Sequence, residues 1–135
     1  MARATAPADS FPAVFDALKS RLRRHAGDLA VLTDRPGRYE VTGRKPYHVT
    51  SLRTGRAIAK RDAYFAGIVI LRGHVGFYFM PACASPGFMD QFSPAMRKRL
   101  KGKSCFHFRR PEEVDDELDR MIVEGRRAFE KIGLI

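Results

Sequence analysis

Apolar residues recur at helical spacing near both ends of the chain. The first run begins after Ser10, a residue type that caps helices, and stops at Gly27, a common helix terminator. Its apolar positions are four, three and four residues apart and therefore share one helix face: Phe11, Phe15, Leu18 and Leu22. The pattern predicts an N-terminal amphipathic helix.

Two further helices are predicted in the second half of the chain. A short one is capped by Ser93, has Pro94 at its first position and ends at Gly102. A longer one opens at Pro111, and acidic residues in its first turns favour the positive end of the helix dipole. Its apolar stripe comprises Val114, Leu118, Met121, Ile122, Phe129 and Ile132.

The middle of the chain has the composition of β-strands. The strongest signal is a pair of β-rich runs, residues 64–71 and 74–80, around the two-residue turn Arg72-Gly73. This turn would place Leu71 opposite His74, Val69 opposite Gly76, and Ile68 opposite Phe77. One face would then carry Tyr64, Ala66, Ile68, Ile70, Val75, Phe77 and Phe79; the other would carry Phe65, Val69, Leu71, His74, Tyr78 and Met80. Because both faces are apolar, the hairpin is expected at the centre of the sheet.

Additional strands are expected on both sides of this hairpin. Residues 39–42 and 47–52 are predicted to pair with each other around residues 43–46, and residues 104–108 form a final strand. In that final strand Cys105 and His107 point to one side. The order of elements predicts an α+β fold, a two-layer sandwich in which an antiparallel sheet of roughly five or six strands has the N- and C-terminal helices packed on one face.

Composition limits the class of protein. A chain of 135 residues with 44% hydrophobic and 30% charged residues is typical of one globular domain, expected here over residues 10–135 after a flexible leader at 1–9. No apolar run suits a signal peptide or a membrane span. Two cysteines without a CxxC motif disfavour a disulfide framework, so a reducing, cytoplasmic setting is expected.

The central segments resemble a known family. Residues 64–67 (Tyr-Phe-Ala-Gly), residues 74–81 (His-Val-Gly-Phe-Tyr-Phe-Met-Pro) and the stretch from Ser93-Pro94 through residues 98–106 are similar to the YdhG-like proteins. The resemblance covers residues 64–110 best, extends through the last helix, and is weak before residue 63. It implies a frataxin/CyaY-like two-layer sandwich, a function not yet assigned, and an iron-handling role suspected for relatives.

The iron role depends on carboxylates that this sequence does not supply. Frataxin-type iron binding uses an acidic ridge on the first helix and adjoining strand, because hard cations prefer clustered oxygen ligands. The first helix region offers Asp9 and Asp16 and then turns basic. No iron ligand is therefore carried over from the resemblance.

Positive charge is concentrated in the body of the domain. Residues 1–110 hold 21 Lys and Arg against 7 Asp and Glu, whereas residues 111–135 hold 4 against 8. The densest cluster is a candidate contact for an anionic small molecule or for nucleic acid phosphates: Arg97, Lys98, Arg99, Lys101, Lys103 and Arg109. The alternative is a solvated surface, because arginine outnumbers lysine 18 to 7 and genomic base composition can produce that bias.

Two other groups are candidate sites. Cys105 and His107 share a strand face and are weak candidates for a metal, although their spacing matches no known structural zinc site. A pocket on the sheet face away from the long helices is expected to involve the stiff loop after the central hairpin, with these lining residues: Phe65, His74, Tyr78, Met80 and Cys83. The alternative is that the loop simply closes that face as a minor core.

Enzyme motifs are absent from the sequence. It contains no Gly-x-Ser-x-Gly, no HExxH and no dinucleotide fingerprint, and Gly102-Lys103-Ser104 lacks the first glycine of a phosphate-binding loop. The sequence therefore predicts a small non-enzymatic cytoplasmic binding module without a cofactor. The alternatives are a nucleic-acid-binding module and an iron or other metal carrier.

Overall fold

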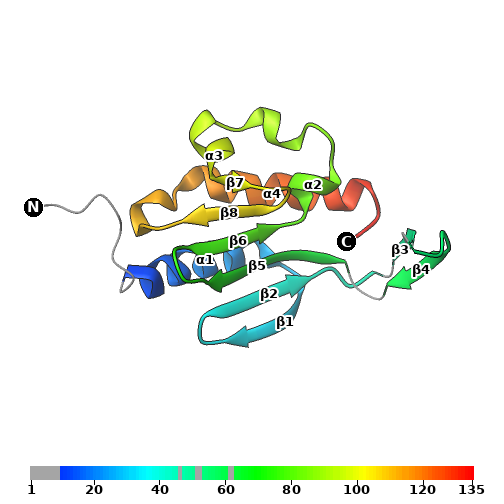
Figure 1. Ribbon diagram of the computed structural model, residues 1–135, viewed down its shortest axis with the longest axis horizontal. Coiled ribbons are helices and arrows are strands. Elements are labelled where there is room, and N and C mark those ends of the chain that lie inside the picture. Colours follow the sequence, from blue (N-terminus) through cyan, green and yellow to red (C-terminus); the bar gives the residue numbers. More distant parts are fainter. Residues whose placement is uncertain (1–9, 46, 51–52, 61–62) are drawn as a thin grey trace, which may run out of the picture.

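Two long helices cover one face of a six-stranded antiparallel sheet. A computed structural model describes residues 10–45, 47–50, 53–60 and 63–135. The helices, α1 (Phe11–Ala26) and α4 (Asp116–Lys131), lie behind the sheet in Figure 1. The six strands, in spatial order, are β1 (Ala30–Arg35), β2 (Arg38–Thr42), β5 (Tyr64–Ile70), β6 (Val75–Phe79), β8 (Cys105–Phe108) and β7 (Leu100–Lys101). The predicted α+β sandwich is confirmed; the predicted leader, residues 1–9, lies outside the described residues.

The core lies between the sheet and the two helices. Helix α1 buries Phe11, Val14, Phe15, Leu18 and Leu22, so its predicted apolar face is confirmed. Strands β5 and β6 are the central pair, and their register matches the prediction, with Ile68 opposite Phe77 and Val69 opposite Gly76. Their inward side chains meet α1 and α4, which makes this hairpin the scaffold of the whole domain.

The predicted pairing of the first strands is wrong. Strand β2 pairs with β1 on one side and with β5 on the other, instead of with residues 47–52. Strand β3 (Tyr47–Thr50) pairs with β4 (Ala57–Lys60) in a separate two-stranded hairpin, which projects beyond the end of the main sheet in Figure 1. Residues 51 and 52, also predicted as strand, lie outside the described residues. The edge strand β1 was missed because most of its side chains are exposed, so it has no alternating pattern.

A β-bulge reverses the predicted direction of two aromatic side chains. Val41 pairs with Ala66, whereas the next residue, Thr42, pairs with Tyr64, so Phe65 is the extra residue of β5. Phe65 consequently points into the helix-covered core, where its ring packs against Phe129 at 5.3 Å between centroids. Tyr64 instead lies on the open face. The sequence placed both rings on the opposite sides, because strict alternation does not anticipate a bulge.

The chain from Met80 to Arg99 does not cover the open face of the sheet. It forms α2 (Pro81–Ala84), the 3₁₀ helix η2 (Phe88–Gln91) and α3 (Pro94–Arg99), which lie along the β7–β8 edge in Figure 1. Arg120 of α4 fixes this segment by donating to the Gln91 carbonyl at 2.7 Å and stacking over the Phe92 ring at 4.4 Å. The segment therefore extends the core beside α4, and none of the described helices covers the opposite face of the sheet.

Three predicted helix ends need correction. Ser10 is itself helical in backbone conformation, and its hydroxyl donates to the Arg109 carbonyl instead of capping α1. Helix α3 stops at Arg99, before Gly102, because Leu100 and Lys101 pair with β8. Gly102, with a φ of 73°, then supplies the turn between the two strands. The last helix begins after Asp115, because Pro111–Glu113 forms a separate 3₁₀ turn.

Ser93 joins α3 to α4 and makes stability pH-dependent. Its hydroxyl caps α3 by accepting from the Met96 amide, and its own hydroxyl and amide donate to the Glu117 carboxylate, each at 2.7 Å. Burial alone would raise the pKa of Glu117, but these hydrogen bonds and nearby arginines lower it. A lowered carboxyl pKa contributes stability above the unfolded value of about 4.3, and that stability is lost as pH falls further.

Replacing Ser93 with alanine is therefore expected to cost about 1 kcal/mol of unfolding free energy at pH 7, as other lost caps do. The cost should shrink as pH falls from 5 toward 3, because Glu117 becomes protonated. Urea denaturation at several pH values measures both effects. An equal cost at pH 7 and pH 3 would contradict the assigned contact.

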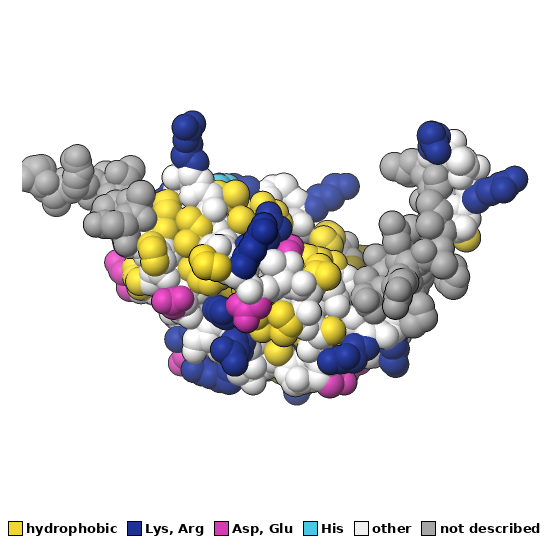
Figure 2. All heavy atoms as spheres, turned by 90° about the horizontal axis from the view of Figure 1, so that it is seen from below, with side chains coloured by type: hydrophobic (Ala, Val, Ile, Leu, Met, Phe, Trp, Pro, Cys, Tyr) yellow, Lys and Arg dark blue, Asp and Glu magenta, His cyan; other side chains and the backbone are white. Residues whose placement is uncertain are grey.

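Neither edge strand of the main sheet is both long and regular. Strand β7 has only two residues, and β1 carries a register shift between Val31 and Thr33. On the β1 edge, the side chains of Val31 and Leu32 are 56% and 60% exposed. Figure 2 views the molecule from the β1 side, where apolar side chains are interspersed with basic and acidic ones.

In the described part of the chain, no helix combines the length and apolar character that crossing a bilayer requires.

Candidate functional site

The open face of the sheet carries polar side chains where a second apolar layer would otherwise pack. The strand register places Gly67, Tyr78, Cys105 and Lys101 in one row across β5, β6, β8 and β7. A neighbouring row contains Val69, Gly76 and His107. The predicted shared face of Cys105 and His107 is confirmed, because strand alternation directs both away from the helices.

Two histidines and a cysteine meet on this face. His74 follows the Arg72-Gly73 turn, and its ring stacks on that of His107 with centroids 3.6 Å apart and planes 15° apart. The ligand atoms of His74, Cys105 and His107 all lie within 4.8 Å of one another. The His74 Nε2 atom is buried and has no hydrogen-bond partner. Among the described residues, this is the one group of three His, Cys, Asp or Glu side chains close enough to share a metal ion.

Gly76 makes room for this group. A Cβ atom built on Gly76 would lie 3.4 Å from the Cys105 sulfur and 3.3 Å from the Leu71 and Tyr78 side chains. These distances are at the short end of normal contacts, so a larger residue would displace the surrounding side chains. The glycine thus permits Cys105 and His107 to approach the β5–β6 turn.

Burial controls protonation in the cluster. It lowers the pKa of His74, and the Arg109 guanidinium lowers it further. It also lowers the pKa of His107, to which the charges of His74 and Arg109 add. Burial raises the pKa of the Cys105 thiol, although a hydrogen bond with Tyr78 opposes that shift. Near neutral pH the group therefore holds uncharged imidazoles and a protonated thiol.

A cationic depression adjoins the cluster and shares His107 with it. The depression has a volume of about 300 Å³ and is lined by Ala95, Lys98, Arg99, Lys101, His107 and Arg109. Helix α3, strand β7 and the end of β8 supply these residues. Arg99 is held in place by Glu113, 3.4 Å away, and by the Phe108 ring, 5.1 Å from the guanidinium carbon. Across the described ranges, no carboxylate forms an ion pair with Lys98, Lys101 or Arg109.

Four of the six predicted anion contacts thus lie together, and two do not. The Arg97 guanidinium turns away to donate to the Phe92 carbonyl. Lys103 is exposed in the β7–β8 turn and does not line the depression. Helical spacing on α3 separates Arg97 from Lys98 and Arg99, a distinction that the run of basic residues alone does not reveal.

The structure does not assemble the predicted pocket. Phe65 is in the core, whereas His74 and Tyr78 are on the open face. Met80 packs against the core and Cys83 is exposed in α2, where its sulfur donates to the Met80 carbonyl at 3.4 Å. The sequence associated His74 with these residues, and missed its approach to Cys105 and His107, because the pairing of β6 with β8 has no local sequence signal.

A second polar group occupies the β2 end of the open face. The Tyr64 hydroxyl donates to Glu40 at 2.8 Å, and Arg38 lies 3.3 Å from the same carboxylate oxygen. Burial, followed by this hydrogen bond, raises the pKa of Tyr64. In this group the Glu40 carboxylate is paired with both neighbouring side chains.

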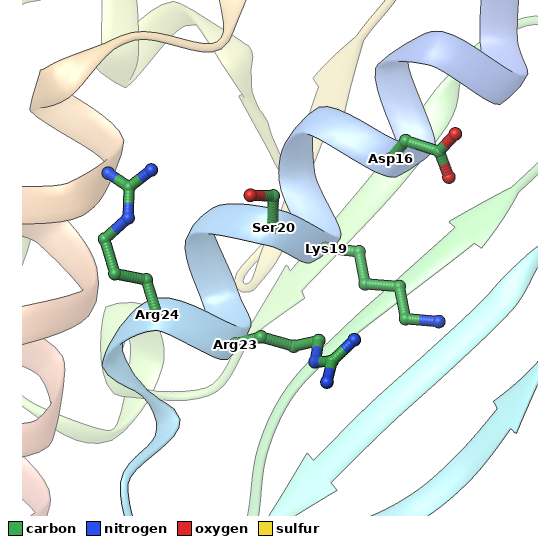
Figure 3. A pocket seen from close by; sticks show the side chains of 5 residues that line it. All are labelled: Asp16, Lys19, Ser20, Arg23 and Arg24. Atoms are coloured by element: carbon green, nitrogen blue, oxygen red, sulfur yellow. The ribbon is translucent and has the colours of Figure 1, made fainter.

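The flank of α1 has another depression, shown in Figure 3, but its side chains do not converge. Asp16, Lys19, Ser20, Arg23 and Arg24 line it. Arg24 points to one side of the helix and Arg23 to the other, and Lys19 is paired with Asp34 at 2.8 Å. Asp16 is the one carboxylate in this depression, so the described residues of α1 do not form the acidic ridge of a frataxin-type iron site.

Comparison with known proteins adds no assignment: no family model, no curated protein and no solved structure matches this chain.

Proposed function

We propose that this protein is a non-enzymatic binding module for a small molecule that carries phosphate, held in the cationic depression. The observation that carries the proposal is the meeting of Lys98, Lys101 and Arg109 on one depression without carboxylate partners among the described residues. Unpaired cations that share a concave surface raise the local concentration of anions and bind them directly.

The chemistry of the lining suits a phosphate group. An arginine guanidinium can donate two parallel hydrogen bonds to phosphate oxygens, and lysine ammonium groups add point charges. Arg99 is already oriented by Glu113 and the Phe108 ring, which lowers the entropy lost on binding. His107 borders the same space and offers a ring nitrogen.

The distribution of ion pairs favours a small ligand over nucleic acid. On the helix side of the molecule, Arg21 pairs with Asp116 and Asp119, and Arg126 pairs with Asp28. Arg44 and Arg97, which a long phosphate backbone would need, donate to carbonyls of their own chain. A depression of about 300 Å³ suits a phosphate group with a small attached body.

Inorganic pyrophosphate tests the proposal. Isothermal titration calorimetry at low salt should show saturable binding to the full chain, weakened when salt is raised. The double variant Lys98→Ala/Lys101→Ala should bind at least ten-fold more weakly, because each charged hydrogen bond contributes about 1.5–3 kcal/mol. Lys103→Ala is the matched control: it removes a nearby lysine outside the depression and should bind normally.

Two results would overturn the proposal. One is the absence of heat with pyrophosphate at low salt. The other is an equal loss of affinity in Lys103→Ala, which would indicate general attraction to a positive surface. A single-stranded oligonucleotide that binds much more tightly than pyrophosphate would favour the nucleic-acid alternative instead.

A further inference from the structure

The group formed by His74, Cys105 and His107 has the composition of a transition-metal site, and its assignment does not depend on anion binding. Two of its members come from β8 and the third from the β5–β6 turn. We propose that these three side chains bind a divalent transition-metal ion, with Zn²⁺ as the best match and an open fourth position.

The donor set selects the class of metal. Imidazole nitrogen and cysteine sulfur are preferred ligands of Zn²⁺ and of neighbouring borderline ions, whereas Mg²⁺ and Ca²⁺ prefer oxygen. Two of the three atoms come from strand β8 and the third from the turn that joins β5 to β6, next to β8 in the sheet. This set differs entirely from the carboxylate ridge that an iron carrier of frataxin type would use.

The buried nitrogen of His74 supports a ligand role. Its Nε2 atom is shielded from solvent yet has no hydrogen-bond partner. A buried polar atom without a partner loses its hydrogen bond to water and gains none in return, so such atoms call for an explanation. A metal bound to that nitrogen would satisfy it.

Coordination of one ion requires the three ligand atoms to draw closer and the two imidazole rings to rotate. The ligand atoms lie within 4.8 Å of one another. On a tetrahedral Zn²⁺ with bonds of about 2.0–2.3 Å, ligand atoms are about 3.5 Å apart. The parallel stack of His74 on His107 must tilt so that both nitrogens point at the ion, and Gly76 adds no side chain that would obstruct this rotation.

Charge balances without an electron transfer. Each imidazole gives a lone pair to the metal, and the Cys105 thiol releases its proton to solvent as the sulfur–metal bond forms. The resulting thiolate offsets part of the repulsion from Arg109 and Lys101. Water or an anion completes the coordination, and His107 borders both this group and the cationic depression.

Cobalt reports on this site directly. Co²⁺ added to the reduced full chain in a buffer free of phosphate should produce a thiolate-to-cobalt charge-transfer band that saturates at one ion per chain. Zn²⁺ should then displace the cobalt and remove the band. Cys105→Ser should abolish it, and His74→Ala or His107→Ala should weaken cobalt binding at least ten-fold.

The second cysteine provides the matched control. Cys83 is exposed and remote from the cluster, so Cys83→Ser should keep the full band. In the wild-type chain, Zn²⁺ should slow alkylation of Cys105 but not of Cys83, which tests the site even if Cys105→Ser folds poorly. The proposal is overturned if wild type gives no band, if Cys105→Ser retains it, or if Zn²⁺ fails to protect Cys105. A loss of the band in Cys83→Ser with one ion per two chains would overturn it in favour of metal-linked pairs.

Discussion

Replacing Phe65 with alanine is expected to lower the free energy of unfolding by about 3–5 kcal/mol, the range for deleting a buried phenylalanine ring. The Phe65 side chain has no exposed surface and meets two other rings edge-on: Phe79 at 5.4 Å and Phe129 at 5.3 Å. Because Phe129 belongs to α4, the substitution loosens the last helix as well as the sheet. Urea denaturation followed by circular dichroism measures the loss.

The neighbouring residue gives the matched comparison. Tyr64→Phe keeps a ring on the open face and removes only the hydrogen bond to Glu40, so it should cost about 0.5–1.5 kcal/mol. Burial of Phe65 and exposure of the Tyr64 face at the bulge predict this order of effects. If Phe65→Ala costs less than Tyr64→Phe, the assigned bulge is wrong.

Gly125→Ala is expected to destabilise the protein by about 1–3 kcal/mol, although alanine is the better helix former. A Cβ at this position of α4 would lie 2.3 Å from the Phe79 ring and 3.0 Å from the Pro81 ring. Phe79 is fully buried and contacts the rings of Phe65, Phe77, Phe88 and Phe106. The helix must therefore shift away from the sheet.

The control for this substitution lies on the exposed side of the same helix. Glu130→Ala leaves the packed face of α4 unchanged and should alter stability by less than about 0.5 kcal/mol. Thermal unfolding of both variants compares them directly. A Gly125→Ala protein as stable as wild type would mean that α4 packs less closely on the sheet than described.

The sequence predicts those parts of the fold whose signal is local. The central hairpin follows from the Arg72-Gly73 turn, which fixes its register over residues 68–77 without reference to the rest of the chain. The long helices follow from spacing. The pairing of β2 with β1 could not be predicted, because β1 shows little burial and no alternation. The pairing of β2 with β5, in turn, accompanies the burial of Tyr39 and Val41, which is a tertiary effect.

The candidate site, too, has residues that a local sequence signal predicts and residues that depend on strand pairing. Alternation along β8 is enough to place Cys105 and His107 together, and the density of cations marks the region that contains Lys98, Lys101 and Arg109 without separating them from Arg97 and Lys103. The contribution of His74 depends on the alignment of β6 with β8, which brings Gly76 opposite His107. Nothing within either strand encodes that alignment; it results from packing Phe77 and Phe106 against the helices.

The register shift in β1 affects how readily a second copy of the chain could pair with the edge of the sheet. An exposed strand edge is a template on which another chain can add by backbone hydrogen bonding. The shift between Val31 and Thr33 interrupts the row of amide and carbonyl groups on one edge, and the opposite edge offers only two residues. Neither border of the six-stranded sheet therefore offers a long, regular ladder to a second chain, although Val31 and Leu32 are exposed on β1.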